Sequence, residues 1–390
     1  MTSEAPMKWT YLFSSNKGDI FPDAASLGQP LYLSSTERHP FLTIKHYFDA
    51  VRLFLFSDNA TPIFTVLSKM SNQAFCLDQI DELVIRSEKQ GSFYLVASVT
   101  VISTEYTAKF TASSAFSDAG RKCLQRDFDI LARLDGLYNT PYLPKAYLLG
   151  NTIVTVEKQN CLFSHCLSEW FDDFHEWHVT GHGKTADQHI CIWDYRRGNR
   201  LLSIIQTDKL CRQVAKILTL YFNPTTFEHI AAWHHAAGDF IIRADDENLE
   251  VRLTTVRDYT PLFIAATDEE PLPLMLGIIH FILRTTLQMR LDKIDGVGES
   301  SWLEIINLSA CLAGFFDGFL ELAAPDRYQL TDIHDLLELL KSFTASELKI
   351  LFGPVLGQLQ LENFADFPLI LAHLEEHITA LHAAIKKYQL

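Results

Sequence analysis

The chain of 390 residues lacks the features that mark several classes of protein. It has no basic excess, because 33 Lys and Arg face 48 Asp and Glu, which gives a formal net charge of −15. Nucleic-acid binding needs clustered Lys and Arg on the phosphates, so this balance argues against a nucleic-acid partner. Seven cysteines stand at scattered positions without a CxxC pair. This pattern favours free thiols in a reducing compartment over a zinc ribbon or a disulfide framework.

Long apolar runs are also scarce. The most apolar run, 272–283, is interrupted by Pro273 and His280 and is too short to span a bilayer. The first fifteen residues lack the basic start and apolar core of a signal peptide. We therefore expect a cytoplasmic protein that does not bind membranes. With 48% hydrophobic and 12% aromatic residues, the chain has enough material for the cores of two or three domains.

The order of the sequence patterns predicts three parts. Residues 1–78 are mixed, and we interpret them as an N-terminal extension packed on the part that follows. Within 79–160, three runs rich in Val, Ile, Thr, Tyr and Phe are separated by short turns, which predicts an antiparallel meander. A helix over 117–137, with Ser117 or Asp118 as its N-cap, and two further strands complete this part.

The third part, 161–390, is predicted to be mainly helical. The segment 161–199 is rich in aromatic residues and histidine, and we interpret it as a helix that leads into a loop. A helix is expected over 201–222, then a loop, a strand within 245–261, and helices after Pro273. The expected fold class is therefore α+β, with an antiparallel sheet followed by a helical part.

Two aspartates mark the region after the helix of 201–222. Asp239 stands in the stretch WHHAAGDF, and Asp258 follows nineteen residues later at the end of a predicted strand. A small antiparallel sheet with one helix, followed by a helical part with such a loop and strand, resembles the two-lobed protein-kinase-like superfamily. It is most similar to the small-molecule branch of aminoglycoside and choline phosphotransferases. The resemblance covers roughly residues 80–325.

The resemblance implies a role for each of several residues. Phosphoryl transfer needs a cation on the nucleotide phosphates, an acid that orients this cation, a carboxylate near the acceptor hydroxyl and a second carboxylate on magnesium. Lys109, in the pattern YTAKFTA, would contact the phosphates of ATP, and Asp127 or Asp129 on the following helix would orient it. Asp239 would orient or accept the acceptor proton, and Asp258 would bind Mg²⁺.

Three features depart from the family pattern. An asparagine is expected five residues after the catalytic aspartate, where this chain has Ala244. Asn248 is the nearest substitute as a magnesium ligand, and Asp245 and Asp246 are the nearest carboxylates. Two alanines are inserted into the family's His-Gly-Asp motif, and the turn SEKQGSF offers Gly91 alone where kinases have a glycine-rich turn over the phosphates.

These observations leave two main hypotheses. One is an ATP- and Mg²⁺-dependent phosphotransferase that acts on a hydroxyl of a small-molecule substrate. The other is a catalytically degraded kinase-like protein, a pseudokinase, that binds or regulates a small molecule or a protein partner. The segment 288–302 is, in either case, a loop lining the acceptor cleft or a connection between helices.

A third hypothesis is a metal-dependent hydrolase. His175, His178 and His182 would share one face of a continuous helix, and three imidazoles there could hold zinc. The alternative is that these histidines are buried among the neighbouring aromatic residues.

Overall fold

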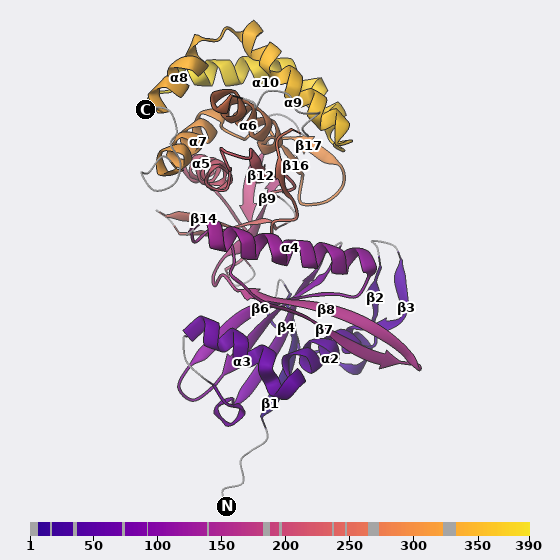
Figure 1. The fold of residues 1–390 in the computed structure, drawn as a ribbon. Helices are drawn as coiled ribbons and strands as arrows, with labels where there is room; N and C mark the ends of the chain where they lie inside the picture. The colour runs from indigo at the N-terminus through magenta and orange to yellow at the C-terminus, as the bar shows by residue number, and fades with distance from the viewer. Residues whose placement is uncertain are drawn as a thin grey trace, which may run out of the picture. The chain divides into compact units, whose positions relative to one another are not determined.

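The computed structural model describes residues 7–15, 18–33, 37–71, 75–91, 93–138, 140–181, 188–194, 197–235, 238–245, 248–263, 273–322 and 333–390. They form a mixed α+β structure that divides into two compact units (Figure 1). The first unit comprises Met1–Asp172 and Tyr195–Arg197, and the second comprises Asp173–Asp194 and Gly198–Leu390. Residues 1–78 thus share a unit with the sheet that follows them.

A six-stranded sheet forms the centre of the first unit, in the order β1-β4-β5-β6-β8-β7. The pairing of β1 with β4 is parallel, and all other neighbours in this sheet are antiparallel. The predicted meander is therefore confirmed, with a parallel strand added to its edge by the N-terminal segment. The strands are β1 (Lys8–Phe13), β4 (Glu82–Gln90), β5 (Leu95–Ile102), β6 (Thr107–Ala115), β7 (Ala146–Val156) and β8 (Gln159–Glu169).

Helices cover both faces of this sheet (Figure 1). On one face, Phe110 and Ala112 of β6 belong to the apolar core that also holds α2 (Ile44–Leu55) and α3 (Ser57–Ser71). On the other face, Ala115 packs with residues of α4 (Asp118–Leu137). The helix α4 is the one predicted from the sequence, and it begins at Ser117, whose hydroxyl accepts from the Gly120 amide at 3.1 Å.

Shorter elements complete the first unit. They are α1 (Ala24–Leu27), the hairpin of β2 (Pro30–Tyr32) with β3 (Arg38–Thr43), and a 3₁₀ turn at Leu77–Gln79. The helix α2 begins at Ile44, directly after the last residue of β3, Thr43.

A five-stranded sheet, in the order β11-β10-β9-β13-β14, lies in the second unit. The helix predicted within 161–199 is wrong, because this segment forms strands. The side chains of Trp177 and Val179, two residues apart, are both buried, as the two-residue period of a strand requires. The strands are β9 (His175–Thr180), β10 (His189–Ile192), β11 (Arg200–Leu201), β13 (Phe240–Ala244) and β14 (Leu249–Leu253).

The strand geometry also removes the predicted one-face histidine cluster. His175 and His178 are three residues apart in β9, so their side chains point to opposite faces of the sheet. Both are buried, as the alternative interpretation expects. His178 lies against Trp193, with ring centroids 3.8 Å apart. His182 lies outside the described residues.

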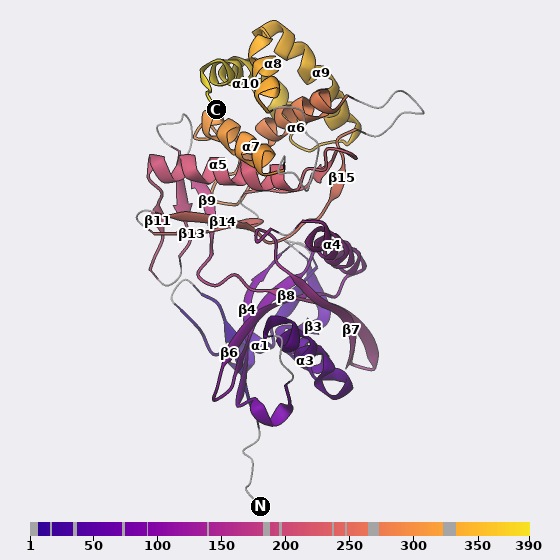
Figure 2. The ribbon, with the colours of Figure 1, turned by 60° about the vertical axis from the view of Figure 1, so that its left-hand side comes forward.

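The rest of the second unit is mainly helical, as predicted. The helix α5 packs on β14 and on α7, and α7 packs on α10 (Figure 2). The segment 288–302 connects α6 to α7, and it does so through a hairpin of β16 (Leu291–Lys293) with β17 (Ser300–Trp302). The helices are α5 (Ile204–Leu220), α6 (Leu274–Met289), α7 (Leu308–Leu322), α8 (Ile333–Ser342), α9 (Ala345–Leu361) and α10 (Phe367–Lys387).

Among the helices that the described residues form, none has both the length and the apolar character needed to cross a membrane.

Candidate functional site

Strand pairing brings the two predicted site aspartates into one region of the second unit. The strand β12 (Glu228–Ile230) precedes the Asp239 loop, and β15 (Tyr259–Pro261) follows Asp258. These strands pair antiparallel, and the Ala231 amide donates to the Asp258 carbonyl at 3.1 Å. The Asp239 carbonyl in turn accepts from the Thr254 amide at 2.7 Å. The backbone on both sides of the loop is thus fixed to the segment that leads to Asp258.

The carboxylate of Asp239 is buried, and both of its oxygens accept from protein donors. Residue Asp239 is 1% exposed. The two terminal nitrogens of Arg257 donate to its two oxygens, Nη1 to Oδ2 at 2.9 Å and Nη2 to Oδ1. Oδ2 also accepts from the His234 amide at 2.9 Å. This bidentate pair is the strong form of an arginine–carboxylate interaction, and it holds the loop against the segment that carries Asp258.

His235 anchors this loop in the apolar interior of the second unit. It is 1% exposed, and its ring lies among Trp177, Trp233 and Phe240, with centroids 4.9, 5.1 and 6.2 Å away. Its Nε2 is 3.2 Å from the carbonyl oxygen of Met289. Burial lowers the pKa of His235 to about 4, so the ring is neutral at pH 7.

Asp258 lies directly before β15, and its residue is half-buried. The second predicted magnesium ligand, Asn248, is at the end of the β13–β14 hairpin that is remote from Asp239. Asn248 is in the turn between β13 and β14, where its amide donates to Oδ1 of Asp245 at 2.6 Å. Asp239 precedes the first residue of β13, so the five residues of that strand, about 16 Å, separate it from this turn. Asp245 is in the same distant turn, and Asp246 lies outside the described residues.

The position of the missing asparagine is occupied by a residue that cannot bind metal. Ala244 is the last residue of β13, pairs with Leu249 and is buried. A carbonyl or carboxylate side chain at this position would point into the apolar interior. The structure therefore brings Asp239 and Asp258 into one region, while the described substitutes Asn248 and Asp245 lie in the remote hairpin turn.

In the first unit, Lys109 is on the face of the sheet that α4 covers. Successive side chains of β6 point to opposite faces of the sheet, and the next residue, Phe110, belongs to the core on the other face. Its Nζ lies 4.2 Å from the ring centroid of Trp170 and 4.0 Å from Oδ1 of Asp172. This arrangement places the lysine beside an aromatic ring and an exposed carboxylate at the end of β8.

Asp127 and Gly91 were the other predicted nucleotide contacts. Asp127 is buried on α4, near Cys166 of β8. The pKa of the Cys166 thiol is raised mainly by burial and, to a smaller extent, by the charge of Asp127. Cys166 pairs with Ser113, four residues along β6 from Lys109. Gly91 closes the β4–β5 turn, and its amide donates to the Tyr94 carbonyl at 3.0 Å, as in an ordinary hairpin.

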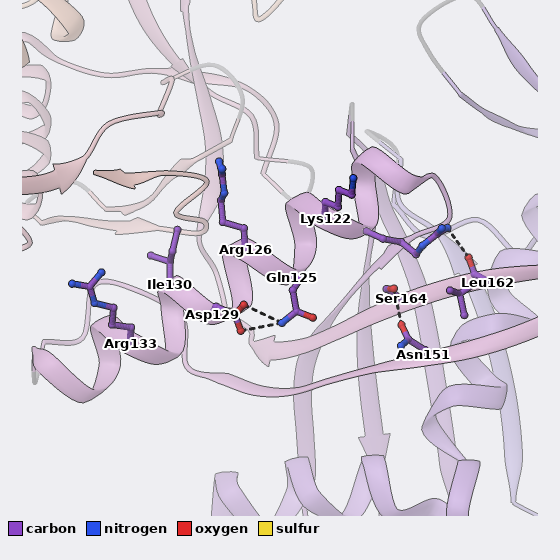
Figure 3. Close-up of a pocket in the computed structure, with 10 residues that line it drawn as sticks. Lys122, Gln125, Arg126, Asp129, Ile130, Arg133, Asn151, Leu162 and Ser164 are labelled. Carbon is purple, nitrogen blue, oxygen red and sulfur yellow. Dashed lines mark hydrogen bonds between the residues drawn. The ribbon is translucent and has the colours of Figure 1, made fainter. Parts of the chain in front are cut away.

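A basic groove in the first unit was not found from the sequence. It has a volume of about 670 Å³ and runs between α4 and the strands β7 and β8 (Figure 3). Four of its lining residues are basic and only Asp129 is acidic; Asp129 accepts from the Gln125 amide at 2.9 Å. The signal was present as a helical repeat of basic residues within an acidic chain. These basic residues are Arg121, Lys122, Arg126 and Arg133.

Arg257 is the other residue that sequence reasoning missed. It directly precedes Asp258 in the sequence, and this position next to a predicted site residue was the one signal for it. No protein-family model matches the chain, and no curated protein matches it.

Proposed function

We propose that the chain is a kinase-like protein that does not catalyse phosphoryl transfer, and that it acts as a binding or regulatory protein. The kinase-like part of the proposal is supported by the order of elements. Within the first unit, after the N-terminal elements, an antiparallel meander is followed by one helix and two more strands. The second unit then has a long helix, the Asp239 loop, a strand hairpin, Asp258 and further helices. This is the order that the resemblance implies.

The bidentate pair of Asp239 with Arg257 carries the non-catalytic part of the proposal. A general base must come within about 2.6–3.2 Å of the atom that carries the proton it accepts. Both oxygens of Asp239 already accept from protein donors, and the residue is 1% exposed. Its neighbour Arg257 also neutralises the charge that would attract the acceptor proton. Asp239 therefore has the environment of a structural carboxylate.

The metal site gives further support. Magnesium prefers several oxygen ligands in an octahedral arrangement. Ala244 supplies no ligand, and Asn248 is used in the distant hairpin turn. Asp258 alone would leave most of the coordination to phosphate oxygens and water, so we expect weak or no magnesium-dependent nucleotide binding.

An active phosphotransferase is the second candidate, and one observation favours it. The pairing of β12 with β15 brings Asp239 and Asp258 into the same region, as phosphoryl transfer requires. In an active enzyme, Arg257 would have to release Asp239 when the acceptor binds.

A thermal-shift experiment separates the two functions. The melting temperature is measured with millimolar ATP, with and without Mg²⁺, for the wild-type chain and for Asp258→Asn. Asp295→Asn is the matched control, because it removes the same charge in the same unit at a left-handed position that asparagine tolerates. The proposal predicts that the melting temperature measured with ATP does not rise further when Mg²⁺ is added. A magnesium-dependent shift that is lost in Asp258→Asn and kept in Asp295→Asn would support the active enzyme instead.

A further inference from the structure

A pocket in the second unit lies beside the hairpin that connects α6 to α7, in a part of the molecule that the proposed function does not use. It has a volume of about 310 Å³. Ser300, Ser301 and Trp302 of β17 line it together with Glu304, and His373 lines it from α10. The pocket therefore has a carboxylate and an imidazole in its wall.

Two side chains that line this pocket, Glu304 and His373, converge with a third, Glu376, in a way that suits a metal ion. Glu304, His373 and Glu376 each offer one ligand atom, and these atoms all lie within 4.8 Å of one another. His373 and Glu376 are three residues apart on α10, so they share one face of the helix. Glu304 comes from the connection between β17 and α7, about seventy residues earlier in the chain.

The imidazole is held in a defined orientation by its aromatic neighbour. The rings of His373 and Trp302 are stacked, with centroids 4.9 Å apart and planes 6° from parallel. Nδ1 of His373 is 4.0 Å from Oε2 of Glu376. The ring of Trp302 itself is buried in the hairpin, where Leu303 donates to the Arg290 carbonyl at 2.7 Å. Preorganised ligands of this kind lose little freedom when a metal binds.

The charge balance at the pocket leaves room for a cation. Arg290 is buried, donates to the Leu303 carbonyl at 3.0 Å, and has Nη1 at 3.6 Å from Oε2 of Glu304. Burial lowers the pKa of Arg290, and the charges of both Glu304 and Glu376 act against that effect. One arginine offsets one of the two carboxylates, so one negative charge remains beside the imidazole of His373.

We propose that Glu304, His373 and Glu376 bind a divalent transition-metal ion of the Zn²⁺ type. One imidazole nitrogen with two carboxylate oxygens is a ligand set that zinc accepts, at about 2.0–2.2 Å from the metal. The bound ion would link α10 to the β16–β17 hairpin. Three protein ligands leave a coordination position toward the pocket, which water or a small anionic ligand would fill. This site is independent of the proposed function of the Asp239 region.

Titration of the chelator-treated, untagged full chain with ZnCl₂ in a calorimeter tests the site. We expect one saturable Zn²⁺ per chain and no comparable binding of Mg²⁺, because imidazole is a poor ligand for magnesium. Glu376→Gln should weaken Zn²⁺ binding at least about tenfold, since it removes one of three ligands. His373→Phe should do the same while it keeps a ring stacked on Trp302.

Glu375→Gln is the matched control, because it makes the same change at the preceding residue of α10, where Glu375 pairs with Lys349 instead. It should bind Zn²⁺ as the wild type does. The side chain of Glu376 is 71% exposed, so Glu376→Gln is expected to fold, and circular dichroism checks this. The proposal is overturned if the wild type shows no saturable Zn²⁺ site. It is equally overturned if Zn²⁺ binds unchanged to both Glu376→Gln and His373→Phe, because the ion would then be bound elsewhere in the chain.

Discussion

Replacing Arg257 with methionine tests whether Asp239 is a structural carboxylate. The substitution removes both Arg257 nitrogens that donate to Asp239 and, among the residues that the structure describes, leaves the His234 amide on Oδ2. Because Asp239 is buried, its charge would lose its partner without gaining water. Breaking a buried ion pair by removal of one partner costs about 3–5 kcal/mol. We expect the free energy of unfolding of the second unit to fall by this amount in Arg257→Met.

The assay is equilibrium unfolding in urea, followed by circular dichroism and tryptophan fluorescence. Arg243→Met is the control, because it breaks the Arg243–Glu250 pair on the nearby β13–β14 hairpin, where both side chains are more than 40% exposed. Exposed pairs contribute about 0–1 kcal/mol, so this control should be nearly neutral. Asp239→Asn should cost less than Arg257→Met, because the Arg257 side chain is 23% exposed and can reach water. If Arg257→Met were as stable as the Arg243→Met control, Asp239 would not depend on this pair and the reasoning would be refuted.

Two further predictions concern packing and pH. Gly314→Ala should destabilise the second unit by about 1–3 kcal/mol, because its Cβ would lie 2.0 Å from the Arg212 carbonyl oxygen of α5. At Gly353 no atom lies within 4 Å of an added Cβ, so Gly353→Ala should instead stabilise α9 by about 0.5–1 kcal/mol. Thermal melts compare the two variants, and equal changes in melting temperature would contradict the close packing of Gly314 on α5. Acid should unfold the chain through five buried histidines whose pKa values burial lowers from 6.5 to about 3 or 4. The unfolded chain binds protons first, so their contribution is complete above pH 6.5 and is lost as the pH falls toward 4. At pH 5.5 each of these histidines lowers the free energy of unfolding by about 1.4 kcal/mol relative to pH 7.5. Urea titrations that gave equal free energies of unfolding at pH 7.5 and 5.5 would refute this prediction. The five are His165, His229, His235, His280 and His377.

The parts of the fold that local patterns determine could be predicted from the sequence. The meander follows from strand-forming runs with short turns, and β4, β5 and β6 pair in that order. The helix α4 was located by its apolar spacing and by its Ser117 cap. Both signals act within a few residues, so the sequence carries them directly.

Long-range pairing could not be predicted in the same way. The strand β9 is stabilised by β10 and by β13, and β13 is more than sixty residues further along the chain. The aromatic and histidine residues of 161–199 fit a buried helix or a buried strand, and only these partners decide between them. For the same reason the sequence pointed to Asp239 and Asp258 as site residues but did not show that Arg257 pairs with Asp239.

ADP formation from ATP and Mg²⁺ is the most direct measurement of whether Asp239 catalyses. The wild-type chain and Asp239→Asn are incubated with radiolabelled ATP at high protein concentration, with a protein-free sample as the blank and circular dichroism to verify folding. We predict that both proteins form ADP at the rate of the blank, because the Asp239 carboxylate is bound to Arg257. ADP formation by the wild type that disappears in a folded Asp239→Asn would contradict this account.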